Sequence, residues 1–357
     1  MEIKKISFSG FRNLFDFEFC PDKNINVICG ANAQGKTNII EGIWLFTGAK
    51  SFRGAKDIEM VGFGKEKANI KMNFVSGEIE RTAEIKIVNK RTATFDEKPL
   101  KTPSLLAGNF CAIVFSPDDL SLVKEGPSAR RRFLDIAIGQ LYPSYINNLK
   151  SYSRALAQRN RIIKEYKIIP NGMELLDIFE EEIYENGKKI ISLRKEYLEK
   201  SLPYISEIYS GISKERETLE FTYITSADEE NLRNALYESR KNDVFSGVTS
   251  VGPHRDDIDF KINGISARKF GSQGQQRSVA LALKLAEAKT LKEITGEEPI
   301  VILDDVMSEL DPKRQDYVLN HIKERQVFIT CCDPSNIKGI KEGKVFNIES
   351  GRIKQEN

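Results

Sequence analysis

The chain has 357 residues, of which 40% are hydrophobic and 30% charged, and its formal net charge is +2. This composition is typical of a globular protein of about two domains and excludes collagen-like and intrinsically disordered chains. The five cysteines include no C-x-x-C pair and there are only two histidines, so neither a disulfide framework nor a zinc centre is indicated. Because no apolar run reaches the roughly 18 residues of a membrane span and the first residues lack a signal-peptide pattern, we expect a cytoplasmic protein without a membrane segment.

The N-terminal part of the chain is predicted to be rich in strands. Alternating or apolar segments occur at residues 3–8, 15–19, 24–29, 69–75 and 80–88. From about Pro127 the apolar spacing becomes helical, and Ile183, Ile190 and Tyr197 repeat every seven residues, which predicts antiparallel helices. Residues 170–172 predict a turn between these helices, and Pro203 predicts the end of a helix or a kink.

After about residue 245 short strands and helices alternate again. The predicted elements are a strand at 258–262, a helix at 275–293, a strand at 300–303, a helix at 312–323 and a strand at 327–330. An α/β pattern interrupted by helices predicts an α/β fold with an inserted all-helical lobe. We place the N-terminal half of the α/β part at residues 1–120, the inserted lobe at 121–245 and the C-terminal half at 246–357.

Charge is distributed unevenly along the predicted lobe. Residues 121–170 carry ten basic and three acidic side chains, a net charge of +7, whereas residues 171–230 carry seven basic and fifteen acidic side chains, a net charge of −8. Two interpretations stay open at this point. The basic stretch could contact nucleic acid, or the two charged segments could be helices that pair with each other.

A phosphate-binding loop follows the apolar strand at 24–29 and precedes a helix-compatible run at 38–46. It matches G-x-x-x-x-G-K-[ST] and consists of Gly30, Ala31, Asn32, Ala33, Gln34, Gly35, Lys36 and Thr37. Glycines let backbone N–H groups face a phosphate, and the helix start favours bound anions. We expect Lys36 to reach the β- and γ-phosphates of ATP and Thr37 to ligate Mg²⁺. The alternative is a glycine turn that merely begins a helix.

An acidic pair ends the apolar strand at 300–303. We assign Asp304 to Mg²⁺ and Asp305 to general-base or water-positioning chemistry, because P-loop enzymes need a second carboxylate for the metal. The alternative is that the pair caps the next helix. The sequence separation of 268 between Lys36 and Asp304 exceeds that of a compact P-loop domain, and the inserted lobe accounts for it.

A third motif precedes the predicted helix at 275–293. It consists of Ser272, Gln273, Gly274 and Gln275. By its chemistry alone it is a helix start that could also receive a phosphate. Together with the P-loop and the acidic pair, the order of motifs resembles ABC-type ATPase heads. That resemblance implies a mixed sheet with an antiparallel β layer, and a signature loop that completes the ATP site of a second subunit in a homodimer.

More specific stretches resemble the RecF family of bacterial recombination and gap-repair proteins. They lie at residues 11–13, 50–53, 115–120, 126–135 and 252–257, and so run through the whole chain. The resemblance implies ATP-dependent binding of single-stranded and gapped duplex DNA as a closed dimer. It also implies work with RecO and RecR to load RecA in recombination, DNA replication restart and the SOS response.

Two departures from the wider ABC pattern concern the ATP site. Residues 115–118 contain no glutamine, and residues 327–332 offer no switch histidine. Asp305 also replaces the commoner glutamate with a shorter side chain. Together these features predict slow hydrolysis, and with the family resemblance they imply a weak, DNA-stimulated ATPase that acts as a switch.

Basic side chains are the candidates for DNA contact, since they neutralise phosphates. They are Arg130, Arg131, Arg132, Arg154, Arg159 and Arg161. The first three could equally brace the lobe through carboxylates such as Asp118 and Asp119. Arg53 and His254 are each either near the nucleotide or structural. The alternative function is an ABC-type ATPase subunit that drives a protein or transporter partner.

Overall fold

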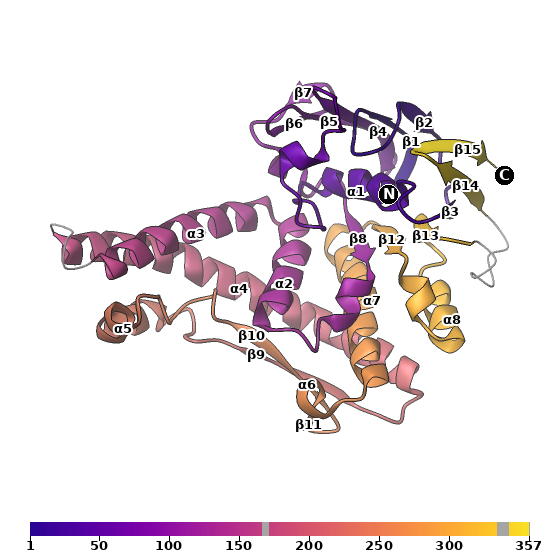
Figure 1. Cartoon of the computed structure of the whole chain (residues 1–357). Helices are drawn as coiled ribbons and strands as arrows, with labels where there is room; N and C mark the ends of the chain where they lie inside the picture. The colour runs from indigo at the N-terminus through magenta and orange to yellow at the C-terminus, as the bar shows by residue number, and fades with distance from the viewer. Residues whose placement is uncertain (166–170, 334–342, 357) are drawn as a thin grey trace. The chain divides into compact units, whose positions relative to one another are not determined.

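A computed structural model describes residues 1–165, 171–333 and 343–356 of the chain (Figure 1). The chain divides into two compact units. The first unit contains residues 1–121 and 280–357, and the second contains residues 122–279.

One sheet of the first unit is antiparallel and has the strand order β2-β1-β4-β5-β6-β7. Its strands are β1 (Glu2–Ser9), β2 (Phe17–Phe19), β4 (Ala68–Ser76), β5 (Ile79–Ile87), β6 (Arg91–Phe95) and β7 (Lys98–Pro99). On β1 the side chains of Ile3, Ile6 and Phe8 are buried. One face of this sheet therefore belongs to the core of the unit, as alternating strands predict.

The second sheet of this unit has the order β15-β14-β3-β13-β12-β8 and is parallel from β14 to β8. Its strands are β3 (Ile25–Cys29), β8 (Ala112–Phe115), β12 (Ile300–Asp304), β13 (Val327–Cys331), β14 (Lys344–Glu349) and β15 (Arg352–Glu356). Every residue of β8, β12 and β13 is buried. Continuous apolar strands of this kind form parallel sheets that are covered on both faces.

Helix α1 (Lys36–Trp44) packs between the two sheets of the first unit. It contacts β8, β12 and β13 of the parallel sheet. On its other side Gly42 approaches the antiparallel sheet so closely that a Cβ atom there would lie 2.3 Å from the Phe8 ring. The P-loop therefore opens a helix held between two sheets, which fixes its position (Figure 1).

Further helices complete the first unit. Helix α8 (Pro312–His321) begins at an N-cap, Asp311, whose carboxylate accepts hydrogen bonds from the backbone N–H groups of Lys313 and Arg314 at 3.1 Å each. Helix α7 (Gln273–Thr295) starts in the second unit and contributes residues from Ala280 onward to the first. Short 3₁₀ helices lie at η1 (Leu45–Thr47), η2 (Asp57–Met60), η3 (Pro103–Leu106), η4 (Pro117–Ser121) and η5 (Val306–Glu309).

The second unit is mainly helical. It contains α2 (Pro127–Leu141), α3 (Pro143–Lys164), α4 (Gly172–Ser213), α5 (Leu232–Ser246) and α6 (Ala267–Phe270). Helices α3 and α4 run side by side in opposite directions, as the apolar spacing predicts (Figure 1). Of the two outcomes predicted at Pro203, a helix end is wrong, because α4 continues through it to Ser213, whereas a kink there stays a prediction. Of the predicted turn at 170–172, residue 170 lies outside the described residues, and Asn171, directly before α4, has a left-handed φ of 56°.

Two predictions about this unit need correction. It is not all-helical, because β9 (Leu219–Ile224), β10 (Asp257–Ile262) and β11 (Ile265–Ser266) form a three-stranded antiparallel sheet. The pairing of β9 with β10 also ties residues beyond 245 to the second unit, which ends at Val279. The predicted boundary after residue 245 is therefore 34 residues too early, whereas the boundary after residue 120 differs by one residue.

The described residues also bear on a possible membrane segment. Within residues 1–165, 171–333 and 343–356, no helix combines the length and the apolar character needed to cross a lipid bilayer.

Candidate nucleotide-binding site

Two glycines give the P-loop its shape. Gly30 has a φ of 155° and Gly35 a φ of 111°, and both lie against neighbouring atoms. A Cβ atom would stand 2.3 Å from the Ile348 carbonyl oxygen at Gly30 and 2.7 Å from Leu14 Cδ2 at Gly35. Only glycine fits such positions without strain. The loop can therefore curl around an anion at the start of α1.

Lys36 and Thr37 occupy the first turn of α1. Lys36 is 4% exposed, and its ammonium group donates to the carbonyl oxygens of Gly30 at 2.8 Å and Ala31 at 3.1 Å. The hydroxyl of Thr37 donates to Asp304 Oδ1 at 3.1 Å. The structure thus brings together the two residues that the sequence assigned to Mg²⁺, although 267 positions separate them.

Asp304 ends β12 in a buried polar position. Its side chain is 7% exposed, and Oδ1 also accepts a hydrogen bond from Thr330 on β13 at 2.8 Å. Burial raises the pKa of Asp304, and the hydrogen bonds from Thr330 and Thr37 oppose that rise. A cation would favour the ionised carboxylate, so the arrangement suits a metal ligand.

Asp305 has a left-handed backbone, with a φ of 51°, and its N–H donates to Thr330 Oγ1 at 2.9 Å. It precedes η5, but its carboxylate makes no capping hydrogen bond to that helix. The alternative interpretation, an aspartate pair that caps the next helix, is therefore wrong for Asp305. The side chain lines the cavity beside the P-loop.

Side chains that motif analysis did not single out as site residues connect the P-loop to the rest of the unit. Arg12 donates from Nε and Nη2 to the two carboxylate oxygens of Glu41 on α1, each at 2.9 Å, and Glu41 is fully buried. Asn13 donates to the Ala33 carbonyl at 3.0 Å. Arg12 and Asn13 belong to a stretch that resembles the RecF family, and that resemblance is the feature of the sequence that could have identified them as site residues.

Arg53 also lies at the nucleotide side of the molecule. It donates from Nη1 to Asn38 Oδ1 at 2.9 Å, and its side chain is 47% exposed. Asn38 in turn donates to Asn13 Oδ1 at 2.6 Å. Of the two alternatives for Arg53, the structure favours a position at the P-loop.

A cavity of about 780 Å³ opens beside these residues. One part of its wall is polar and contains Lys36, Thr37 and Asp305, whereas another part is apolar and contains Ile58, Val61 and Phe63. Cavities for nucleotide-sized ligands commonly have this volume and this combination of surfaces. The arrangement provides an anion-binding end and an apolar surface on which a base could rest.

The signature loop lies in the second unit, at the start of α7. The Ser272 hydroxyl accepts from the Gln275 N–H at 3.2 Å, and the Ser272 N–H donates to Gln275 Oε1 at 2.8 Å. This reciprocal pair is a capping box, so the helix-cap interpretation is correct within one chain. Ser272 and Gln273 remain exposed, and they are available to a second molecule.

Comparison with known proteins agrees with this geometry. A family described as AAA ATPase domain matches residues 1–250. "DNA replication and repair protein RecF" of Clostridium acetobutylicum is 41% identical over 362 residues and 99% of both chains, and that of Agathobacter rectalis is 38% identical over 357 residues and 99% of both. A solved structure of RecF with ATP shares 37% identity and a TM-score of 0.91 over 100% of this chain and 97% of that one.

The chain belongs to the RecF family. Its members are DNA replication and repair proteins, and the alternative of an ABC-type subunit for a transporter is not favoured. The head domain of an Smc protein from Pyrococcus furiosus has a TM-score of 0.55 at 18% identity over 100% of this chain and 95% of that one. That likeness supports the predicted ABC-type P-loop ATPase fold.

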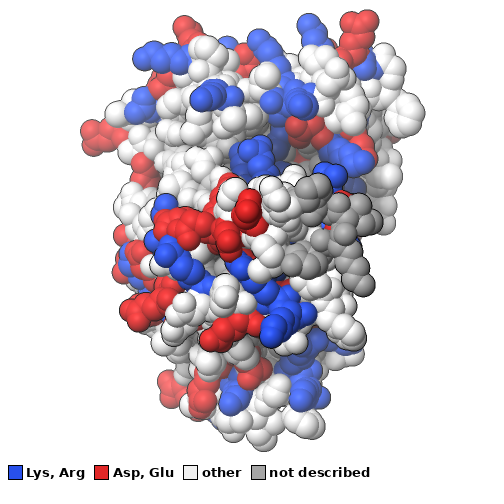
Figure 2. Space-filling model, turned by 90° about the vertical axis from the view of Figure 1, so that its left-hand side faces the viewer, with Lys and Arg blue, Asp and Glu red and all other residues white. Residues whose placement is uncertain are grey.

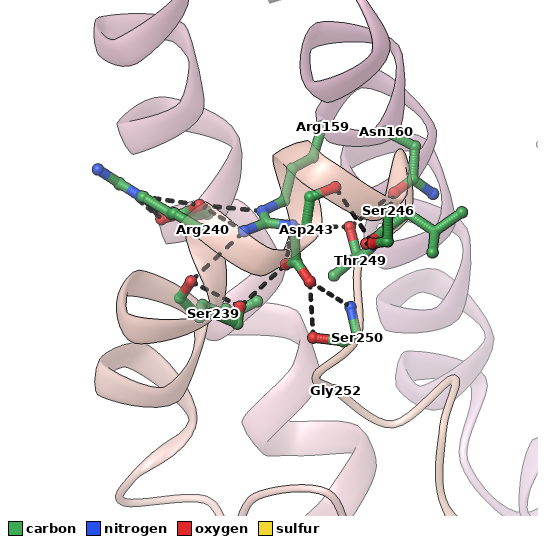
Figure 3. A network of polar contacts seen from close by, with 12 residues as sticks. Arg159, Asn160, Ser239, Arg240, Asp243, Ser246, Thr249, Ser250 and Gly252 are labelled. Atoms are coloured by element: carbon green, nitrogen blue, oxygen red, sulfur yellow. Dashed lines mark hydrogen bonds and ion pairs between the residues drawn. The ribbon is translucent and has the colours of Figure 1, made fainter.

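The RecF-family fold buries two of the arginines that the sequence assigned to DNA. Arg159 on α3 is fully buried, and it donates to Glu180 of α4 at 2.9 Å and to Asp243 of α5 at 2.8 Å (Figure 3). Arg130 is 2% exposed and forms a two-fold hydrogen bond with Asp257, at 2.6 and 3.0 Å. The prediction that these two contact DNA is therefore wrong in this structure, because their donors are used internally.

The remaining candidates differ in exposure. Arg131 is partly buried and donates to the Asp256 carbonyl at 2.8 Å, whereas Arg132, Arg154 and Arg161 are exposed. Figure 2 shows the face on the left-hand side of Figure 1, where α3 ends and α4 begins, and acidic and basic side chains are intermixed there. The sequence left two interpretations of the uneven charge open. For the buried arginine Arg159, the structure supports pairing between oppositely charged helices, because its partners lie on α4 and α5.

His254 has a structural environment. Its Nδ1 lies 2.6 Å from the Tyr152 hydroxyl and its Nε2 lies 3.0 Å from the Thr249 carbonyl oxygen. A carbonyl only accepts, so Nε2 carries the proton and Nδ1 accepts from tyrosine. Burial is the main reason that the pKa of His254 falls to about 4, and nearby Arg255 lowers it further. The ring is therefore neutral at pH 7 and fastens the 249–254 segment to α3.

Proposed function

We propose that this chain binds ATP with Mg²⁺ and, with ATP bound, pairs with a second copy on single-stranded and gapped duplex DNA. In this role it would help RecO and RecR to load RecA during recombinational repair and the SOS response. The observation that carries the proposal is that Lys36 and Thr37 of the P-loop line one cavity and that Thr37 also donates to Asp304. RecF-family membership supports the DNA part, and a structure of RecF with ATP supports the nucleotide.

The donor set at the P-loop fits Mg²⁺. Thr37 Oγ1 and Asp304 Oδ1 are hard oxygen atoms 3.1 Å apart, and Mg²⁺ is usually bound through one or two such groups plus phosphate oxygens and water. The ion would neutralise charge on the β- and γ-phosphates. In the protein, Thr330 holds Asp304 in place with a hydrogen bond of 2.8 Å.

Asp305 would orient the water that attacks the γ-phosphate. The backbone N–H of Asp305 donates to Thr330, and this hydrogen bond fixes the backbone from which the carboxylate extends at the edge of the cavity. Its side chain is one methylene shorter than that of glutamate, which favours slow turnover. We infer a switch, in which ATP binding closes the dimer and slow hydrolysis opens it.

Lys36→Met tests the ATP-dependent part of the proposal. Wild type should bind a labelled gapped duplex at least tenfold more tightly with ATP–Mg²⁺ than without nucleotide, because closure adds a second DNA-binding copy. Lys36→Met should lose that gain while keeping its nucleotide-free affinity. Fluorescence anisotropy at one stated salt concentration measures both values.

Lys90→Met is the matched control, because Lys90 is an exposed lysine of the same unit in the turn between β5 and β6. It should behave as wild type. If wild type binds DNA in no nucleotide state, a direct DNA function is ruled out. If the ATP effect survives in Lys36→Met, the assignment of the P-loop is wrong.

Asp305→Asn tests the hydrolytic assignment. Loss of a general base typically slows a reaction by about 10²- to 10⁴-fold, so phosphate release should fall in that range. ATP binding should persist, since Lys36 and Thr37 are intact. Asp316→Asn, on the exposed side of α8, is the control and should leave phosphate release unchanged. Unaltered turnover in Asp305→Asn would remove Asp305 from the reaction.

The exposed arginines define the proposed DNA surface. Arg132, Arg154 and Arg161 can reach phosphates from the surface of the second unit, and such contacts release counterions. Replacing all three with alanine should lower the slope of log affinity against log salt by about 0.9 for each phosphate contact that is lost. An unchanged slope would place the DNA elsewhere.

Co-elution of wild type with purified RecR and RecO on gel filtration tests the partner part of the proposal.

A further inference from the structure

Strand order places the end of β13 at the centre of the nucleotide site. In the parallel sheet β13 lies between β3, which leads into the P-loop, and β12, which ends at Asp304. The carboxyl ends of parallel strands meet at one edge of a sheet, where ligands of open α/β folds bind. The residue that directly follows β13 therefore lies between the phosphate-binding loop and the acidic pair. That residue is Cys332.

The thiol of Cys332 contacts two side chains of the P-loop. Its Sγ donates to Asn32 Oδ1 at 3.1 Å and lies 3.8 Å from the ammonium nitrogen of Lys36. Both Asn32 and Lys36 line the cavity described above. Lys36 is the side chain proposed to reach the β- and γ-phosphates. A thiol in contact with it therefore lies on the terminal-phosphate side of the nucleotide.

Cys332 is the exposed cysteine that contacts the P-loop. Cys29 and Cys331 are buried register partners on β3 and β13, and burial raises the pKa of both, that of Cys331 to about 12. Cys111 is also buried. Cys20 is the other exposed cysteine, and it belongs to the segment between β2 and β3 rather than to the P-loop.

We propose that Cys332 is a nucleotide-contact residue that faces the terminal phosphate of bound ATP, so that its thiol is open to electrophiles only when that phosphate is absent. The inference rests on the proposed binding of ATP. ADP would leave the position of the terminal phosphate empty, whereas ATP would fill it and cover the sulfur. Cys332 thus reports which nucleotide is bound.

Alkylation by iodoacetamide tests the proposal on the full chain. In this reaction the sulfur forms a bond to carbon, iodide leaves and the thiol proton passes to solvent. With a non-hydrolysed ATP analogue and Mg²⁺, modification of Cys332 should slow at least tenfold, and with ADP less than twofold. Cys20 should react equally in every sample. Peptide mass spectrometry measures each cysteine separately.

Nucleotide binding is measured in the same samples by equilibrium dialysis, which separates two failures. No binding would overturn the proposed function, on which the inference rests. Binding of both nucleotides with equal protection, or with none, would overturn the placement of Cys332 at the terminal phosphate while leaving ATP binding intact.

A second copy of the chain could also cover Cys332, and the same experiment distinguishes this case. It is repeated at a protein concentration where light scattering finds only monomers. Protection of the monomer by the ATP analogue supports the direct contact. Protection that occurs only in dimers overturns it.

A substitution series gives a readout that is independent of alkylation. Cys332→Phe should weaken binding of the ATP analogue at least tenfold and that of ADP less than twofold, because the ring would occupy the position of the terminal phosphate. Cys332→Ser keeps the size of the side chain, so its loss of affinity for the ATP analogue should be much smaller than that of Cys332→Phe. Cys20→Phe is the control for a bulky exposed residue. Equal loss of ATP and ADP affinity in Cys332→Phe would overturn the proposal.

Discussion

At the scale of single residues, the arginines of the second unit show how burial separates side chains that the sequence treats alike. Arg159 is fully buried between three helices, whereas Arg154, five positions earlier on the same helix, is exposed. The partner Asp243 is 84 residues away along the chain, so local spacing could not reveal the pairing. The P-loop could be found because all its residues are consecutive.

His254 provides a test at this scale. Its folded-state pKa of about 4 is lower than the ordinary value of 6.5, so the unfolded chain takes up a proton first as the pH falls. The contribution of His254 to stability is therefore complete above pH 6.5 and is lost between pH 6.5 and about 4. At 1.36 kcal/mol per pH unit the loss amounts to about 3 kcal/mol.

Urea unfolding followed by circular dichroism at several pH values measures this loss. Wild type should lose about 3 kcal/mol more than His254→Gln over the window, because glutamine does not titrate. His321→Gln leaves His254 intact and should keep the steeper loss. Parallel curves for wild type and His254→Gln would mean that His254 accepts its proton in the folded state.

At the scale of elements, local pattern located strands and helices but missed how some of them pair. The positions of the apolar strands β3, β12 and β13 were predicted correctly, because a strand that is buried on both faces has a continuous run of apolar residues in the sequence. Strand β9 was missed, since it lies in the acidic stretch and alternates between exposed and half-buried residues. Its partner β10 begins 33 residues after β9 ends, so the sheet and the true boundary of the unit depend on a long-range contact.

Helix α5 is held by a buried polar network rather than by a wide apolar face. Asp243 is fully buried and accepts from Arg159 Nη1 at 2.8 Å and from the Ser250 N–H at 3.0 Å (Figure 3). Arg240 contacts Glu180 and Asp177 of α4. The network joins α3, α4, α5 and the segment that leads to His254, so its loss should free α5.

Asp243→Ala tests the network. Breaking a buried ion pair by removing one partner costs about 3 to 5 kcal/mol, because Arg159 keeps a buried charge that Glu180 alone must balance. Hydrogen exchange of the α5 amides should therefore become faster by at least a hundredfold. Asp177→Ala removes an exposed partner of Arg240 and should cost at most about 1 kcal/mol. Equal exchange in the two variants would show that the network does not hold the helix.

At the scale of the whole molecule, the motifs of the proposed ATP site belong to different units. The P-loop and Asp304 lie in the first unit, and Ser272 lies in the second. Ser272 is exposed at the start of α7, where its capping box leaves the side chain at the surface. In a head-to-tail dimer with two-fold symmetry, each of two sites would combine the P-loop of one copy with the signature loop of the other.

Mixing two inactive variants tests this shared site. Lys36→Met removes the P-loop lysine and Ser272→Arg blocks the signature loop, so each variant alone should have no DNA-stimulated phosphate release. In a mixed dimer one site carries both defects and the other carries neither. A one-to-one mixture forms mixed dimers in half of the pairs, so activity should recover to about a quarter of the wild-type value per chain.

The recovered phosphate release should depend on protein concentration, which that of an active monomer would not. Dilution should abolish the recovered activity, because each intact site needs two chains. A mixture of Lys36→Met with Asp305→Asn is the control, because both changes lie in the same unit as the P-loop. Each site of the mixed dimer then contains either the defective P-loop or the defective carboxylate. No activity should therefore return. Activity of Ser272→Arg alone at the wild-type level would mean that ATP is hydrolysed without the second copy.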